Sequence, residues 1–299
     1  MQRRLTFSTA LLLTVPPLLW AGNAVVGRLV RDAVPPMTLN LLRWSIALLI
    51  LLPLGRAAFR PGSGALLHWR RYALLGLTGI GLYNSFQYLA LQSSTPINVT
   101  LVAAGMPVWM MLVGRLFFNV PIRPWQSAGA VLSIAGVLVV LCRGDWQQLA
   151  GLRLVPGDVY MILATIAWSF YSWMLMQKND VPALRSDWAA FLLVQVMYGV
   201  LWSGALSGIE WTVGDPKPVA WSGAVVAALA YVAIGPAILA FRCWGAGVAR
   251  AGPAVGAFFV NLTPLFTALL SSAFLHEPPH LYHLLAFALI VGGIGISAR

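Results

Sequence analysis

Long apolar stretches recur along the whole chain, each separated from the next by a short segment rich in polar residues, Gly or Pro. A helix needs about 20 residues, at 1.5 Å of rise each, to cross the hydrocarbon layer of a membrane. The pattern therefore predicts an all-α integral membrane protein with ten transmembrane helices. The predicted spans are 8–29, 37–54, 72–91, 97–118, 124–142, 157–177, 188–208, 219–241, 253–275 and 281–298.

The composition agrees with a membrane protein and changes the meaning of the net charge. Hydrophobic residues make up 60% of the chain and charged residues only 9%. In a soluble protein a net charge of +11 would suggest nucleic-acid binding. Here the arginines lie in short loops between apolar stretches, where they follow the positive-inside bias and attract membrane lipids. We therefore expect lipids, and no nucleic acid, as partners.

The distribution of Lys and Arg predicts the orientation of the chain. If the N-terminus is cytoplasmic, most of these residues fall in cytoplasmic loops, so both termini are expected inside the cell. The apolar run after Arg3 and Arg4 resembles a signal peptide. It is too long for one and contains Trp20, so we interpret it as a retained first helix.

Two stretches, 96–140 and 253–297, align when one is shifted by 157 positions. The shift superimposes three prolines of each stretch: Pro96 on Pro253, Pro107 on Pro264 and Pro121 on Pro278. This repeat divides the chain into 1–150 and 151–299, with five predicted helices in each half. An odd number of helices places the halves upside down relative to each other, which predicts two inverted five-helix repeats around a central cavity.

Several motifs together resemble the EamA type of the drug/metabolite transporter superfamily. They are Trp20-Ala21-Gly22-Asn23, Arg43, the pattern Pro107, Pro121, Gly129 and Gly136, and its second copy Pro264, Pro278 and Gly293. The resemblance covers nearly the whole chain. It implies export of small metabolites, most often amino acids, across the bacterial cytoplasmic (inner) membrane. The many Trp and Tyr residues suggest a resemblance to the YddG-like exporters of aromatic and other amino acids. One departure is that Val120 stands where the second copy has Glu277.

Polar and aromatic residues near the middle of the predicted spans are the candidates for substrate binding. Trp20 and Asn23 share a helix face, and a shift of 148 positions places them on Trp168 and Tyr171. Such residues suit a solute with an amine, a carboxylate and a variable side chain. The alternative for each is a hydrogen bond between helices. The candidates are Trp20, Asn23, Arg43, Tyr83, Gln87, Trp109, Trp168, Tyr171 and Asn261.

Arg43 and two prolines have specific expected roles. Arg43 lies within a span, where it would bind a substrate carboxylate or, alternatively, reach the outer interface with its long side chain. Pro107 and Pro264 lie about ten residues into their spans, roughly 15 Å deep. They are expected to bend helices that line the cavity, with a simple packing kink as the alternative.

The remaining residue types exclude other chemistry. All acidic residues lie in loops or at span ends, so facilitated or weakly coupled export is the simpler expectation. His276, Glu277, His280 and His283 suggest a metal site, but Pro278 and Pro279 interrupt the helix between them, so no metal is expected. No phosphate-binding glycine motif occurs, which argues against an ATP-driven pump and any cofactor.

Two other functions stay open. A multidrug effluxer of aromatic or quaternary cations would hold its cation on aromatic faces, although a membrane carboxylate is missing. An integral membrane enzyme would need clustered His, Asp or Glu, so we do not expect an enzyme. The expected partners are a small-molecule substrate and lipids, with a monomer as the simplest assembly.

Overall fold

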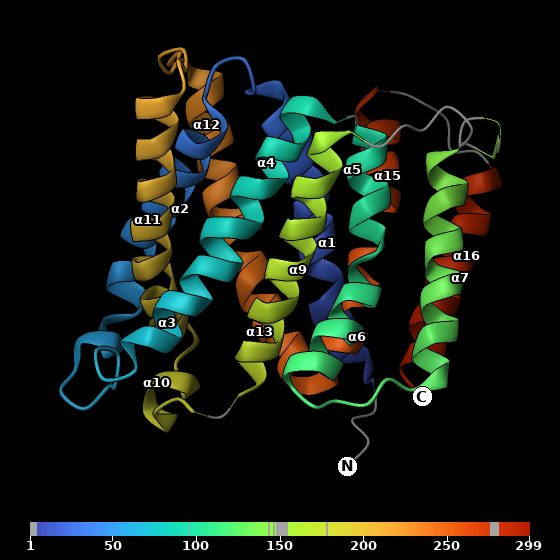
Figure 1. Ribbon diagram of the computed structural model, residues 1–299, viewed down its shortest axis with the longest axis horizontal. Coiled ribbons are helices and arrows are strands. Elements are labelled where there is room, and N and C mark those ends of the chain that lie inside the picture. The colour runs from blue at the N-terminus through green and yellow to red at the C-terminus, as the bar shows by residue number, and fades with distance from the viewer. Residues whose placement is uncertain are drawn as a thin grey trace.

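The computed structural model describes residues 5–299 except 95, 143, 146, 148–154, 178 and 276–280. This part of the chain is helical and contains no strand. The helices run roughly side by side in one bundle, with α2 and α11 at one side and α7 and α16 at the other (Figure 1). The chain enters α1 and leaves α16 at the end of the bundle where α10 lies, which we call the α10 end (Figure 1).

Helices occupy every predicted span. They are α1 (Phe7–Leu29), α2 (Pro36–Leu54), α3 (Trp69–Gly76), α4 (Tyr83–Ser93), α5 (Pro96–Ala104), α6 (Met106–Phe117), α7 (Pro124–Leu141), α9 (Pro156–Met176), α11 (Trp188–Val213), α12 (Gly223–Val232), α13 (Ala240–Ala251), α14 (Pro253–Val260), α15 (Thr263–Leu275) and α16 (Leu281–Ser297). Two π-helical segments, η2 (Leu77–Leu82) and η3 (Ala233–Leu239), join α3 to α4 and α12 to α13. The short elements η1 (Arg56–Phe59) and α10 (Pro182–Ser186) lie in loops.

Length and composition make six of the described helices candidate membrane spans. They are Phe7–Gly27, Pro36–Leu54, Pro124–Leu141, Pro156–Met176, Trp188–Val213 and Gly223–Ala251. Large apolar side chains also lie on the outer surface of the bundle, among them Leu49, Leu201 and Leu284. In water such a surface would be unstable, whereas lipid solvates it.

Two predicted spans are interrupted just before a proline. The stretch 97–118 leaves the helix at Gly105 and restarts as α6, and 253–275 leaves it at 261–262 and restarts as α15. Pro107 and Pro264 each lie in the first turn of the restarted helix. A proline is tolerated there because its missing N–H has no intrahelical partner to lose. Whether these breaks act as hinges stays a prediction.

The predicted end of the span 219–241 is wrong, because the helix continues through η3 and α13 to Ala251. The prediction stopped at the charge of Arg242. In the structure the guanidinium carbon of Arg242 lies 4.2 Å from the ring centroid of Trp188, so the charge rests on an aromatic face without ending the helix.

The two π-helical segments occupy corresponding positions in the chain. The shift of 157 that aligns the prolines also places Gly79 of η2 on Pro236 of η3. A π-helical turn widens the helix and leaves some carbonyls without their usual partner. In both halves, therefore, the helix is irregular at the same point.

Helices α7 and α16 pack closely along a seam of glycines. A Cβ on Gly129 would lie 2.7 Å from the carbonyl oxygen of Gly293, and one on Gly136 would lie 2.9 Å from that of Ala286. Such distances exclude any side chain larger than hydrogen without movement of a backbone. The shift of 157 positions places Gly129 on Ala286 and Gly136 on Gly293. The contact of Gly129 with Gly293 therefore corresponds to the contact of Ala286 with Gly136, with the two helices exchanged.

Candidate functional site

A cluster of buried aromatic rings surrounds Trp168 at the middle of α9. Trp168 is fully buried and contacts Trp20 edge to face, with centroids 5.2 Å apart, and Tyr83 at 4.7 Å. Edge-to-face and tilted pairs are favourable because the positive edge of one ring meets the negative face of another. The other rings in contact with Trp168 are Tyr171, Phe241 and Trp244. We call these six residues the aromatic cluster.

The helical period explains how α9 presents this face. Trp168, Tyr171 and Ser172 are three and four residues apart, so they project from one side of the helix. Ser172 Oγ accepts a hydrogen bond from Trp244 Nε1 at 3.1 Å, which orients that indole. The indole nitrogen of Trp168, by contrast, is buried and has no partner. A ligand with an acceptor atom would satisfy it.

Both π-helical segments border the aromatic cluster. Trp20 Nε1 donates to the carbonyl oxygen of Pro236 in η3 at 3.3 Å. Gly79 in η2 approaches Tyr171 so closely that a Cβ on it would lie 2.5 Å from the ring. The irregular turns therefore provide a hydrogen-bond acceptor on one side and close backbone approach on the other.

Arg43 lies beside the cluster and is 1% exposed, so it does not reach the outer interface. Its Nη1 donates to Asn84 Oδ1 and to Tyr88 Oη, both at 3.1 Å. Its Nε is buried without a partner. The structure thus places a buried cation one residue from Trp44, whose ring contacts Phe241 at 4.9 Å.

The other predicted residues are less closely joined to the cluster. Asn23 is buried and its Oδ1 has no partner, while Gln87 is half-buried. Trp109 is half-buried on the first turn of α6, beside the break at Gly105. Asn261 lies at the break between α14 and α15 and donates to Ser133 Oγ of α7 at 2.8 Å, as a hydrogen bond between helices. Substrate binding by any of these residues stays a prediction.

Sequence reasoning missed three members of this region, Trp44, Phe241 and Trp244. Trp44 follows Arg43 directly, and its burial depends on the rotation of α2. Trp244 was missed because the predicted span ended at residue 241. The three-residue spacing of Phe241 and Trp244, continued beyond Arg242, was the available signal that the buried helix face went on.

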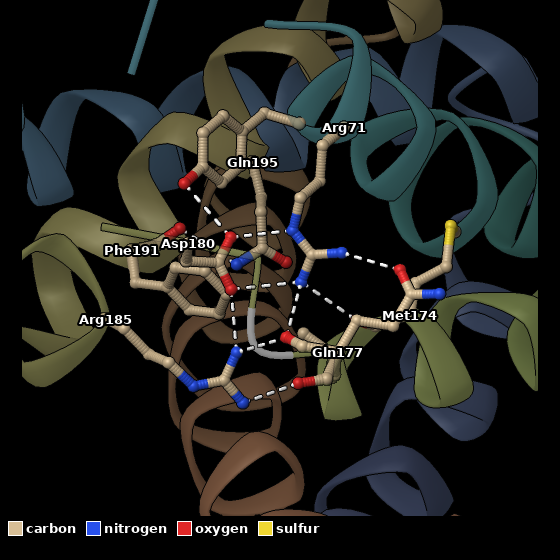
Figure 2. A network of polar contacts seen from close by, with 9 residues as sticks. Arg71, Met174, Gln177, Asp180, Arg185, Phe191 and Gln195 are labelled. Atoms are coloured by element: carbon tan, nitrogen blue, oxygen red, sulfur yellow. Dashed lines mark hydrogen bonds and ion pairs between the residues drawn. The ribbon is translucent and has the colours of Figure 1, made fainter. Parts of the chain in front are cut away.

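A polar network at the α10 end joins α3 to the segment between α9 and α11 (Figure 2). The carboxylate of Asp180 lies between two arginines, with Arg71 Nε and Arg185 Nη1 each 2.7 Å from one of its oxygens. Tyr72 Oη also donates to Asp180, at 3.1 Å. The same arginines donate to carbonyl oxygens at the C-terminus of α9, those of Met174, Leu175 and Gln177. We call this set the Asp180 network.

Electrostatics explains why Asp180 stays charged although its side chain is fully buried. Burial alone would raise its pKa. The hydrogen bonds and charge of Arg71, with the bonds from Arg185 and Tyr72, outweigh burial and hold the pKa of Asp180 below its ordinary value. The arginines also satisfy carbonyls that the end of α9 would leave without partners. The network therefore fixes the last turn of α9 against α3.

The remaining metal candidates lie largely outside the described residues. His276, Glu277 and His280 fall in the segment 276–280, so neither that site nor the Val120–Glu277 mismatch is described. Within the described residues, no group of three or more His, Cys, Asp or Glu lies close enough to hold a metal ion.

Several known transporters are similar to this chain over most of its length. A transporter from Archaeoglobus fulgidus described as uncharacterized is 26% identical over 97% of this chain and 96% of its own length. The aromatic amino acid exporter YddG of Ancylobacter novellus is 28% identical over 94% of this chain and 93% of its own. A probable amino-acid metabolite efflux pump of Salmonella typhimurium is 26% identical over 77% of this chain and 75% of its own.

A solved structure titled only as the crystal structure of a protein shares the fold, with a TM-score of 0.75 over 97% of both chains and 22% identity. The model of the EamA-like transporter family matches residues 7–142 and 155–299. The chain, a membrane-embedded multi-pass protein, therefore belongs to the EamA-like transporter family.

Proposed function

We propose that this protein exports small metabolites, chiefly amino acids including aromatic ones, across the bacterial cytoplasmic membrane. The aromatic cluster carries the proposal, because it joins α1 of the first half to α9 and α13 of the second. It offers aromatic faces together with the unpaired indole nitrogen of Trp168. Two relatives named for amino-acid export support this substrate class.

The proposed architecture is ten transmembrane helices in two inverted five-helix repeats, 1–150 and 151–299. Three observations support it: the shared register of the π-helical segments, the helix breaks before Pro107 and Pro264, and the exchanged contacts of the α7–α16 seam. Two helix pairs correspond in the same way. In the repeat α4 is equivalent to α13 and α1 to α9, and α4 packs on α9 just as α13 packs on α1. Inverted repeats with a site between them are an architecture for alternating access.

The α10 end is the cytoplasmic end in this proposal, because Arg and Lys gather in its loops and termini. There the ion pair between Arg71 and Asp180 joins the halves, and Arg185 of the second half also pairs with Asp180. The opposite end is joined as well, because Glu210 at the end of α11 accepts hydrogen bonds from Met37 N and Thr38 N at the start of α2, both at 2.9 Å. We infer that the Asp180 network opens when substrate enters from the cytoplasmic side.

Counterflow in liposomes tests the proposed function. Purified protein in vesicles preloaded with unlabelled phenylalanine should take up labelled phenylalanine faster than empty vesicles do. A labelled quaternary amine should show no such exchange. Exchange of the amine without exchange of any amino acid would refute the proposal and favour the multidrug alternative.

A further inference from the structure

Arg43 is a buried cation that forms no ion pair with any described residue. In the described chain the ion pairs are Arg31–Asp32, Arg71–Asp180 and Arg185–Asp180, and Arg43 belongs to none of them. A charge withdrawn from water is costly unless an opposite charge and hydrogen bonds compensate it. The neutral partners of Arg43 supply only part of that compensation.

The atoms of Arg43 and Asn84 that are buried without a partner are both donors. Asn84 Oδ1 accepts from Arg43, which leaves Asn84 Nδ2 buried and without a partner. Arg43 Nε is buried and unpaired as well. A buried donor without a partner destabilises the protein, and a ligand that accepts from it removes that penalty. Two neighbouring N–H donors, one of them charged, match the two oxygens of a carboxylate.

This pair of donors adjoins the aromatic cluster along two helices. On α2, the guanidinium carbon of Arg43 lies 5.3 Å from the ring centroid of Trp44, which contacts Phe241. On α4, Asn84 follows Tyr83, which contacts Trp168. An anion bound here would have its apolar remainder within reach of the aromatic rings. Lipid headgroups are excluded because the Arg43 side chain is buried inside the bundle.

We propose that Arg43 and Asn84 form a carboxylate subsite of the transport pathway, so that substrates carry a carboxylate next to an apolar or aromatic group. The subsite rests on the proposed function for its place in a pathway. It predicts discrimination against amides, esters and simple cations of the same size, which lack the anionic group.

Binding measurements on the purified protein test the subsite without requiring transport. Phenylalanine and phenylalaninamide differ at the carboxylate, and intrinsic tryptophan fluorescence reports binding near the aromatic cluster. A charge-assisted hydrogen bond corresponds to at least about a tenfold preference for phenylalanine. In Arg43→Gln this preference should fall to within about twofold, and Arg43→Lys should keep part of it. A preference that survives in Arg43→Gln, or equal weakening of both ligands, would overturn the proposal.

Asn84→Asp provides a second variant that does not remove the cation. It places a carboxylate where the amide oxygen now lies 3.1 Å from Arg43 Nη1. We expect this internal anion to raise the melting temperature and to abolish the preference for phenylalanine. Unchanged ligand preference in Asn84→Asp would contradict the subsite. A stability increase produced in the wild type by sodium chloride alone, matching that of phenylalanine, would assign the site to an inorganic anion and overturn the proposal too.

The two proposals can fail separately. Arg43-dependent binding of phenylalanine without counterflow would refute export and leave the subsite standing. Counterflow of phenylalanine that is unaffected by Arg43→Gln would leave export standing and refute the subsite.

Discussion

The indole rings of Trp20 and Trp168 meet edge to face, with centroids 5.2 Å apart and planes at 88°. The 148-position shift relates these two residues, one on the first helix of each half. In the proposed two-repeat architecture, α1 and α9 are equivalent helices that approach each other through equivalent side chains. Any ligand held by this pair contacts both halves, so movement of one half against the other changes its site.

Replacing Trp168 by Phe should weaken substrate binding by about two- to tenfold, because the indole N–H is the unpaired donor of the aromatic cluster. The matched control is Trp244→Phe, which removes the same volume from the same cluster. In the wild type the indole N–H of Trp244 donates to Ser172, so it is not free to bind a ligand. Trp244→Phe should therefore lose more thermal stability and less substrate affinity than Trp168→Phe. Fluorescence titration and thermal melting measure the two effects. Equal losses of affinity would contradict a role for the Trp168 N–H.

Asp180→Asn should loosen the α10 end, because Arg71 and Arg185 lose their shared anion. A reporter cysteine at Leu175, on the last turn of α9, measures the opening by its reaction with a membrane-impermeant maleimide. The native Cys142 and Cys243 are replaced by Ser in this background. We expect labelling to rise about tenfold, equivalent to roughly 1.4 kcal/mol. The exposed pair Arg31–Asp32 provides the control, since Asp32→Asn should leave labelling unchanged.

The same network predicts how opening depends on pH. The folded pKa of Asp180 lies below its ordinary value, so its stabilising contribution is complete above the unfolded pKa of about 4. That contribution is lost only as pH falls through the lowered folded value. The labelling rate of Leu175→Cys, divided at each pH by that of a free thiol to remove the change in thiolate fraction, should therefore stay constant from about pH 5 to 8. A titration within that range would show that Asp180 does not hold the end closed.

Gly129→Ala should destabilise the protein by about 1–3 kcal/mol, because the new methyl would meet the carbonyl oxygen of Gly293. Gly295→Ala is the matched control on α16, since a Cβ there meets nothing within 4 Å. Thermal unfolding in detergent should show a lower melting temperature for the first variant only. Similar melting temperatures for Gly129→Ala and Gly295→Ala would mean that α7 and α16 move apart to accept the methyl group without loss of stability.

Replacing Pro107 and Pro264 together by Ala should slow transport several-fold and lower the folded yield by a smaller factor. Alanine restores a backbone N–H and permits a continuous helix across each break, which would stiffen both helices. Counterflow rates and the yield of monodisperse protein provide the two readouts. Equal losses in both would leave the prolines only a packing role.

Apolar length was enough to predict the helices, because lipid requires about the same length of every span. It was not enough to predict their irregularities. Gly79 and Pro236 lie in π-helical turns, whose sequences look like ordinary apolar helix. One extra residue in a single turn changes the pattern of apolar positions too little to be recognised. The repeat of the prolines did indicate where α6 and α15 restart.

The candidate site was only partly predictable for a related reason. Trp20, Tyr83, Trp168 and Tyr171 were chosen by depth, and the structure brings them together. The depth of a residue in its span does not show which way its side chain points, so the hydrogen bond from Asn261 to Ser133 of α7 could not be foreseen. Arg71 and Asp180 are 109 residues apart, and no local pattern pairs them.

The seam between α7 and α16 has a consequence for biosynthesis. Gly129 and Gly136 are made well before the backbone that covers them, which belongs to the 17-residue helix α16. Until the ribosome has released that helix, the first half stays in the membrane with its closest-fitting face uncovered. Loss of α16 alone would therefore leave the seam face of α7 without its partner.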